Sequence, residues 1–481
     1  MNTPYQVASL SETTSAHSNP KANYAHLVII SHESVGEKMA GPGIRAWELA
    51  RALGRYGVPV TLLTPLPSER QASNVEICHF AWDDPSSLQR QIEDADVILA
   101  TGPVLSRVVR VLGKPIEKPV IVDTYYVPEI EEVLLHLTTR RYDFDPTPAY
   151  IQEMFTYLRQ GDYFLCALES QRDFFLGALM AAGRINGQTL RDDFAGASLI
   201  GIVPLGLPDD PPLRGPNRMK GVIQGIEPSD KVIFWGGGIW DWMDPLSLMG
   251  ALKLVIRERD DIRVVFGSLH HFSKGIVPEM SIARQLISWI EREQWLGKYV
   301  FFQDWIPYDD RGSALLEADL GITLGIDTIE SRYAVRARLM DFLWAGLPCV
   351  LTRGDAVANL LGEVGLADLV QPKDENAVAQ AILNRLEAGQ FREDGLQEAS
   401  SWINPLKWSN CVNPILDFLK APRMAADGEN ARASLNELVP IHKAWEALRQ
   451  ENEAQREVIR ALRARKFDRI AHAFGRLLHG A

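Results

Sequence analysis

The sequence lacks the features of a membrane-spanning or nucleic-acid-binding protein. No uncharged, mostly apolar run approaches the roughly 18 to 20 residues that cross a bilayer, and the polar residues 1–23 contain no apolar run of signal-peptide length. We expect those residues to form a disordered tail. Acidic side chains outnumber basic ones by 62 to 50, for a formal net charge of −12. The chain therefore has no general attraction to a polyanion, and nucleic acid is not an expected partner.

Cysteine is scarce, and no two cysteines have a metal-binding or redox spacing. Cys78, Cys166, Cys349 and Cys411 are far apart, with no CxxC pattern. Most of them lie in apolar, strand-like runs, which predicts buried thiols in a reducing compartment. We therefore expect a cytoplasmic protein, free in the cytosol or at the inner face of the membrane.

The chain of 481 residues, 46% of them hydrophobic, exceeds the size at which one core keeps growing, so at least two domains are expected. From Tyr24 onward, short β-branched runs such as HLVIIS and DVILATG alternate with segments of helical period, a pattern typical of a parallel sheet with helices on both faces. The Pro- and Gly-rich stretch DDPPLRGPNRMKG interrupts this pattern, and a second alternating series follows. We expect an α/β protein with two facing Rossmann-like domains and a C-terminal helical tail. The expected boundaries are a first domain at 24–208, a linker at 209–221, a second domain at 222–420 with a crossing helix near 405–420, and a tail at 421–481.

Glycines follow the first strand of each half: Gly41 and Gly43 in the first domain and residues 236–238 in the second. Glycine lets backbone N–H groups approach a ligand closely, and a helix N-terminus attracts negative charge; an ordinary tight turn is the alternative. Neither loop is GxGxxG, and the next strands end in LLTP and VVFGS, without the acidic residue that holds a ribose in dinucleotide folds. NAD-dependent redox chemistry is therefore disfavoured, and we expect a phosphorylated ligand of another kind.

The segment ESRYAVRARLMDFLWAGLPCVLT, residues 330–352, carries the strongest functional signal. Arg336, Arg338 and Asp341 stand at or near the start of a predicted helix, and a spacing of three places Arg338 and Asp341 on one face. An Arg beside a helix N-terminus can clamp a diphosphate, and a carboxylate one turn on can accept both hydroxyls of a ribose. The alternative is an ordinary surface ion pair above apolar core residues.

With these motifs, the chain resembles the GT-B glycosyltransferases of the family 4 type. In that family an acidic residue precedes a small-residue, Gly, x, Pro run, as Asp341 precedes AGLPCVLT. The likeness covers most of residues 24–420 and includes GPGIRAWELARALGRYGVPVTLLTP in the first half and FWGGGIWDWMDPLSL in the second. It implies transfer of a sugar from a nucleotide sugar, held by the second domain, to a hydroxyl acceptor on the first, with retention of anomeric configuration.

The resemblance also implies roles for individual residues. Asp341 matches the family's ribose-binding carboxylate and Arg338 its phosphate-binding cation, while Gly41 and Gly43 match glycines that face the cleft. Arg338 is accordingly the expected catalytic cation, because an oxocarbenium-like transition state builds negative charge on the departing diphosphate.

Glu330 is a second catalytic candidate. Many family members have a Glu eight residues before the ribose carboxylate, but this chain has Tyr333 there, and Glu330 stands eleven residues before Asp341. Glu330 either takes the place of that Glu near the donor sugar or caps a loop. The expected donor-binding set is Gly238, Trp240, Arg336, Arg338 and Asp341.

Polar residues at strand ends of the first domain are candidates for the acceptor side. FLCALESQRDFFLGAL resembles the end of the first domain in these enzymes and brings Glu169 to the cleft, and VIVDTYYVPEIEE ends a strand with Asp123 and Tyr125. Such groups can hydrogen-bond a sugar; helix capping by Asp123 and packing of the tyrosines remain open. His270 and His271 also follow a strand, as cleft residues or as a solvated loop. The expected acceptor or cleft set is Gly41, Gly43, Arg45, Asp123, Tyr125 and Glu169.

No metal or other cofactor is predicted. Asp143, Phe144 and Asp145 have the DxD form with which GT-A transferases hold a divalent ion, but they lie between helical segments and are expected to form a turn. The resemblance implies that cationic side chains and helix dipoles bind the diphosphate instead. The nucleotide sugar is then a co-substrate.

The tail, residues 435–481, reverses the sign of the overall charge. From Arg456 onward it has seven basic against two acidic side chains, with Phe467, Ile470 and Phe474 at helical spacing. A basic amphipathic helix of this kind is typical of a membrane-surface or partner-binding element. Self-association or packing on the protein's own body are the alternatives.

The expected function is glycosyl transfer from a nucleotide sugar to a glycan or lipid-linked acceptor, in cell-envelope polysaccharide or glycoconjugate synthesis. Two other functions stay open. A nucleotide-sugar epimerase on the same fold would convert the donor without an acceptor, and a non-catalytic protein would use the tail as a scaffold for other enzymes.

Overall fold

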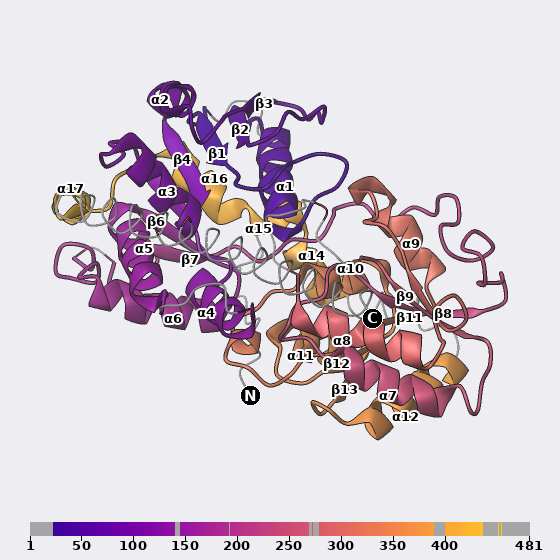
Figure 1. The fold of residues 1–481 in the computed structure, drawn as a ribbon. Helices are drawn as coiled ribbons and strands as arrows, with labels where there is room; N and C mark the ends of the chain where they lie inside the picture. Colours follow the sequence, from indigo (N-terminus) through magenta and orange to yellow (C-terminus); the bar gives the residue numbers. More distant parts are fainter. Residues whose placement is uncertain are drawn as a thin grey trace, which may run out of the picture.

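The computed structural model describes residues 23–139, 145–191, 193–268, 272, 279–388, 400–435, 451 and 454. They form two α/β domains, each built on one parallel sheet, and the last helices return to the first domain (Figure 1). The expectation of two Rossmann-like domains is confirmed.

The first domain is a seven-stranded parallel sheet in the order β3-β2-β1-β4-β5-β6-β7. Its strands are β1 (Leu27–Ile30), β2 (Val60–Thr64), β3 (Val75–His79), β4 (Val97–Thr101), β5 (Val120–Asp123), β6 (Tyr163–Cys166) and β7 (Ile200–Ile202). Its helices are α1 (Gly41–Arg55), α2 (Pro85–Asp94), α3 (Gly102–Leu112), α4 (Pro128–Thr139), α5 (Thr147–Gln160) and α6 (Glu169–Ala181).

The second domain is a six-stranded parallel sheet in the order β10-β9-β8-β11-β12-β13. Its strands are β8 (Lys231–Trp235), β9 (Ile262–Phe266), β10 (Val300–Phe302), β11 (Leu320–Thr323), β12 (Cys349–Thr352) and β13 (Ala367–Val370). Its helices are α7 (Pro245–Val255), α8 (Ser281–Arg292), η1 (Tyr308–Asp310), α9 (Arg311–Glu317), η2 (Glu330–Arg332), α10 (Ala337–Ala345), α11 (Ala356–Glu363) and α12 (Glu375–Ala388).

The apolar runs that predicted strands form the centres of both sheets. Every residue of β1, β2, β5, β6 and β11 is buried, as expected for parallel strands covered by helices on both faces, whereas the edge strand β3 is only partly buried. In each sheet the strand order reverses once, between β1 and β4 and between β8 and β11. In open α/β sheets, ligands bind outside the carboxyl ends of strands at such reversals.

The chain crosses back to the first domain through α14 (Ser400–Leu406), α15 (Trp408–Cys411) and α16 (Asn413–Lys420). Leu207 and Lys407 form a parallel bridge, and the Phe418 ring stacks on the Tyr163 ring with centroids 5.4 Å apart. A Cβ on Gly206 would stand 2.3 Å from the Trp408 ring, so only glycine fits this close approach. These contacts attach the returning segment to the first domain.

A short helix, α17 (Gly428–Ala433), follows and is anchored on the first domain by ion pairs. Arg184 pairs with Asp427 at 3.0 Å, and Arg432 pairs with Asp162; all four side chains are buried. The predicted basic helix beyond Arg456 lies outside the described residues. So do residues 1–22 and the predicted features at 143–144 and 270–271.

The burial of the cysteines and the length of the helices can be compared with what the sequence predicts. All four cysteines are free, and Cys166, Cys349 and Cys411 are buried while Cys78 is partly so. Among the residues that the structure describes, no helix is both long enough and apolar enough to cross a membrane.

Candidate functional site

The two domains touch on one side through the start of α6. The Gln171 side-chain amide donates 2.7 Å hydrogen bonds to the carbonyl oxygens of Tyr125, in its own domain, and Tyr333, in the second domain. The hydroxyl of Ser170 donates to the carbonyl of Arg332 at 3.0 Å. Glu169, expected at the cleft, is the first residue of this helix, half-exposed and 3.5 Å from Arg172. The β6–α6 turn therefore lies against the η2 segment of the second domain.

On the other side, Tyr308 joins the domains. Its backbone N–H donates to the carbonyl of Glu37 at 2.8 Å, and its hydroxyl donates to the Glu48 carboxylate at 2.7 Å. Close by, Arg70 pairs with Asp309 at 3.1 Å. The carboxyl edges of the two sheets thus face each other and are joined at two places, and the boundary between them is called the cleft below.

The strongest donor-side feature is Arg338, in the first turn of α10. Its Nη2 donates to the carbonyl of Gly238 at 2.7 Å, and its guanidinium lies against Gly237, where a Cβ would be only 3.3 Å from Nη2. Gly237 also has φ +71°, which favours glycine. The Nη1 of Arg338 is buried and has no hydrogen-bond partner among the described residues. Burial, followed by the charge of Arg336, lowers the pKa of Arg338 to about 9.

Asp341, one turn further along α10, pairs with Arg311 rather than with Arg338. Arg311 Nε lies 3.3 Å from Oδ1 of Asp341, and the guanidinium of Arg311 sits over the rings of Tyr308 and Trp344, 3.7 and 4.7 Å from their centroids. Burial raises the pKa of Asp341, and the Arg311 charge opposes that rise. Sequence reasoning missed Arg311, because it lies thirty positions from Asp341 and no motif joins the two.

Arg336 is already neutralised by carboxylates. Its Nη2 donates to Glu330 at 2.8 Å and its Nε is 3.1 Å from Asp355; both carboxylates are buried, and Arg336 is partly buried. Glu131 of α4 faces this cluster from the first domain, and its pKa is raised to about 8 by burial and then by the charge of Glu330. Glu330, expected as a catalytic carboxylate or a loop cap, therefore holds Arg336 at the domain boundary. Asp355 and Glu131 were not singled out from the sequence.

The glycine loop after β8 continues into an aromatic pair. Trp240, expected in the donor set, stacks on Trp242 with ring centroids 5.1 Å apart. Asp241 between them accepts hydrogen bonds from the N–H of Ile282 at 2.8 Å and the hydroxyl of Ser281 at 3.1 Å, which fixes the loop to the start of α8. Together with the carbonyl of Gly238 on Arg338, these contacts set the shape of the loop.

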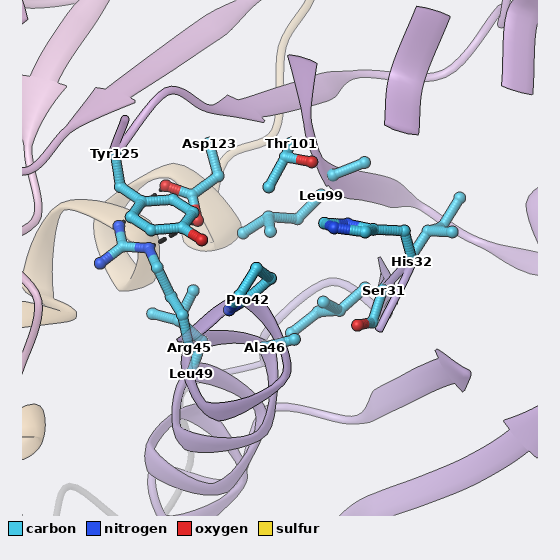
Figure 2. A pocket seen from close by; sticks show the side chains of 13 residues that line it. Ser31, His32, Pro42, Arg45, Ala46, Leu49, Leu99, Thr101, Asp123 and Tyr125 are labelled. Atoms are coloured by element: carbon cyan, nitrogen blue, oxygen red, sulfur yellow. Dashed lines mark hydrogen bonds and ion pairs between the residues drawn. The ribbon is translucent and has the colours of Figure 1, made fainter. Parts of the chain in front are cut away.

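On the first-domain side, Arg45 and Asp123 form a buried, bidentate ion pair with N–O distances of 2.6 and 2.8 Å (Figure 2). Arg45 also donates to the carbonyls of Val203 and Pro204 at 3.0 Å each, and it lies 4.7 Å from the centroid of the Tyr125 ring. The predicted cleft residues Arg45, Asp123 and Tyr125 are thus brought together, and the two charges cancel each other.

Of the two glycines expected to face the cleft, only Gly43 is at a position where a side chain would clash with neighbouring backbone. A Cβ there would meet the carbonyl oxygen of Ser34 at 2.7 Å, whereas a Cβ at Gly41 would meet nothing within 4 Å. Gly43 therefore lets the β1–α1 loop pack against the start of α1.

His32 and Glu33 follow β1 directly and were not predicted as site residues. The His32 side chain is exposed to solvent on one side and lines a hollow of the first domain on the other. Desolvation by the neighbouring protein, followed by the charge of Arg107, lowers the pKa of His32 to about 4. Burial raises the pKa of Glu33 to about 7. Their position at the carboxyl end of a central strand was the only sequence signal that could have found them.

A small hollow opens on each side of the cleft, with a volume of about 20 Å³ in each case. The first lies between β1, β4, β5 and α1, and the second lies at the ends of β11 and β12 beside Arg336. Within the described ranges, no group of three or more His, Cys, Asp or Glu side chains is arranged to hold a metal ion.

The two facing Rossmann-like domains, with the returning C-terminal helices, have the GT-B fold of glycosyltransferases. No protein-family model matches the chain, and no curated protein matches it. The likeness is to solved structures, and at these identities it concerns the fold.

Three of these structures illustrate the match. HepE from Anabaena, in complex with UDP-glucose, superposes with a TM-score of 0.59 at 12% identity, over 83% of this chain and 100% of that one. A sucrose-phosphate synthase from Thermosynechococcus elongatus gives 0.54 at 12% identity, over 81% and 97%. WaaG, a glycosyltransferase involved in lipopolysaccharide biosynthesis, gives 0.53 at 13% identity, over 82% and 100%.

Proposed function

We propose that this protein is a retaining glycosyltransferase, which moves a sugar from a nucleoside diphosphate sugar on the second domain to a hydroxyl acceptor on the first. The proposal extends to cell-envelope polysaccharide or glycoconjugate synthesis in the cytoplasm, at the inner face of the membrane. In support, HepE has the same fold and a structure with UDP-glucose, and WaaG has the same fold and a lipopolysaccharide role.

One observation carries the proposal: the buried Nη1 of Arg338 has no hydrogen-bond partner among the residues that the structure describes. A buried guanidinium nitrogen without a partner is costly unless a ligand completes its hydrogen bonds. Arg338 stands in the first turn of α10, where the helix dipole also favours an anion. A diphosphate seated there would receive both contributions. The charge that builds on it as the sugar departs would be stabilised by groups already in position.

In this proposal, Asp341 binds the ribose of the nucleotide. A carboxylate accepts two hydrogen bonds from a diol, and Asp341 is one helical turn from Arg338 on the same face. In the structure its Oδ1 is engaged by Arg311. A bound ribose would therefore share or replace the Arg311 contact. Arg311 would then lie beside the nucleotide, between the rings of Tyr308 and Trp344.

Glu330 and Arg336 receive a supporting role in the proposal. The Arg336 charge is balanced by Glu330 and Asp355, so it has less to offer a phosphate than Arg338. Their contacts would hold the η2 segment, next to the start of α10, in place. We propose no metal and no other cofactor, because Arg338 and the helix N-terminus supply positive charge where the diphosphate would lie.

A screen of nucleotides tests the proposal. The thermal unfolding temperature is measured with UDP, GDP, ADP and their glucose or mannose conjugates, and products are followed by mass spectrometry with and without a mixed glycan and lipid acceptor fraction. We expect stabilisation by one base and an acceptor-dependent glycoside product. Conversion of the donor without acceptor would instead identify an epimerase, and stabilisation by no nucleotide would leave the scaffold alternative.

A further inference from the structure

The hollow on the first-domain side lies where the strand order reverses, between β1 and β4. Figure 2 shows the rings of His32 and Tyr125 directed toward it from opposite sides, with Thr101 on one flank and Pro42 of α1 on another. Its volume of about 20 Å³ admits a single water-sized group. The hollow can therefore take one hydroxyl-sized group of a larger molecule that lies in the cleft.

The charges in this hollow are already balanced. Arg45 uses four of its five N–H groups on Asp123, Val203 and Pro204, and each carboxylate oxygen of Asp123 accepts from it, so the charges of the pair offset each other. Arg107 is near enough to affect His32, but it does not line the hollow, and its guanidinium lies 4.0 Å from the centroid of the Trp82 ring. An anionic group would thus be placed beside Asp123, and Arg45, the cation among the lining residues, is already paired with that carboxylate.

Two uncharged polar groups in the hollow are able to bind a hydroxyl. The Oγ1 of Thr101 is buried and has no hydrogen-bond partner among the described residues. The His32 imidazole is accessible and, being neutral near pH 7, offers one donor and one acceptor nitrogen. A neutral hydroxyl, which both donates and accepts, matches this pair.

We propose that the hollow holds one hydroxyl of an uncharged sugar acceptor, bound by Thr101 and His32, and that phosphorylated sugars are excluded. The inference rests on the proposed glycosyltransferase function and names the chemical class of its acceptor. Charge supports the exclusion, because a phosphate oxygen in the hollow would lie beside Asp123, whose only cationic neighbour in the lining is already paired with it.

Thr101→Val tests the hydrogen bond with little risk to folding. The replacement keeps the shape and removes a buried hydroxyl that has no partner, so we expect an unfolding temperature at or above that of the wild type. His32→Ala removes the second group. His79→Ala is the matched control, because His79 is an exposed histidine at the end of the edge strand β3 and does not line the hollow.

Binding is measured by saturation-transfer NMR on the full chain, with the methyl glycosides of glucose, galactose and mannose, and with glucose 6-phosphate, each in the presence of the nucleotide selected by the screen. We expect at least one neutral glycoside to bind and glucose 6-phosphate not to bind. Thr101→Val should weaken that glycoside about two- to tenfold, the range for one lost hydrogen bond. The His79→Ala control should bind it like the wild type.

Three outcomes would overturn the inference: no neutral glycoside binds, glucose 6-phosphate binds as tightly as the glycosides, or both Thr101→Val and His32→Ala leave glycoside binding unchanged. Nucleotide binding by the same samples separates this failure from that of the proposed function. If the protein binds a nucleotide through Arg338 but fails these tests, the proposed function stands and only the proposed acceptor class is wrong.

Discussion

The replacement Arg338→Met should make the protein more stable and less able to bind its nucleotide. Arg338 has a buried Nη1 without a hydrogen-bond partner in the described part of the chain, and its Nη2 donates to the carbonyl of Gly238. Methionine fills similar space without a charge. We therefore expect the Arg338 side chain to bind the ligand and, without a ligand, to lower the free energy of unfolding.

The magnitude follows from the environment of the guanidinium. Its pKa is lowered from 12.5 to about 9, chiefly by burial, and each tenfold loss of proton affinity corresponds to about 1.36 kcal/mol against the charged form. Water at the partly exposed portion of the side chain reduces that penalty, so we expect a net gain of about 1–3 kcal/mol in the free energy of unfolding. At about 2–4 °C per kcal/mol, the unfolding temperature without ligand should rise by roughly 2–12 °C.

Nucleotide affinity should change in the opposite direction. Losing a charge-assisted contact worth about 1.5–3 kcal/mol weakens binding about 10- to 150-fold. Calorimetry of unfolding, with and without the selected nucleoside diphosphate, measures both effects on one sample. Arg257→Met is the control, because Arg257 is exposed just after α7, and its replacement should shift stability by no more than about 0.5 kcal/mol. An Arg338→Met protein that unfolds earlier and binds the nucleotide normally would refute the reasoning.

Three further predictions concern the cleft. Asp341→Asn should abolish the preference for a nucleoside diphosphate over its 2′-deoxy analogue, as measured by competition binding. An unchanged preference would show that Asp341 does not bind the ribose. Tyr308→Phe deletes the 2.7 Å hydrogen bond to Glu48 across the domains. We expect a loss of about 1.5–3 kcal/mol in the free energy of unfolding and a larger radius of gyration by small-angle scattering. A variant as compact as the wild type would contradict this prediction. Burial and the charge of Glu330 raise the pKa of the Glu131 carboxyl from 4.5 to about 8. Because the folded state then binds a proton that the unfolded state has lost, the free energy of unfolding should fall as the pH rises from about 4.5 to 8. Glu131→Gln should reduce this pH dependence, as measured by thermal unfolding at several pH values.

Local patterns were enough to predict the fold and the strand ends. Strands such as β1 and β11 are short apolar runs whose burial on both faces requires a parallel sheet, and they are bounded by Gly and polar residues that cannot continue them. Gly238 could be selected because it stands just after β8, and Arg338 because it lies at the start of the helix between β11 and β12, on the edge where ligands of such sheets bind.

The partners of the site residues could not be predicted, because they come from distant parts of the chain. Asp123 ends a strand, but its cation, Arg45, is on a helix 78 positions earlier. Glu48 meets Tyr308 over 260 positions and across two domains. Such pairs depend on how the helices and domains are placed in space, which hydrophobic periodicity does not encode.

The return of the chain to the first domain has a consequence for synthesis on the ribosome. Trp408 and Phe418 belong to the same hydrophobic core as Leu27 and Tyr163, so the N-terminal half lacks part of its interior until those residues are made. Because roughly 200 residues separate β7 from Trp408, a ribosome adding about 5–20 residues per second leaves this core incomplete for about 10–40 s. During that interval the surface around Gly206 and Tyr163 is uncovered apolar area, the kind that chaperones bind in nascent chains.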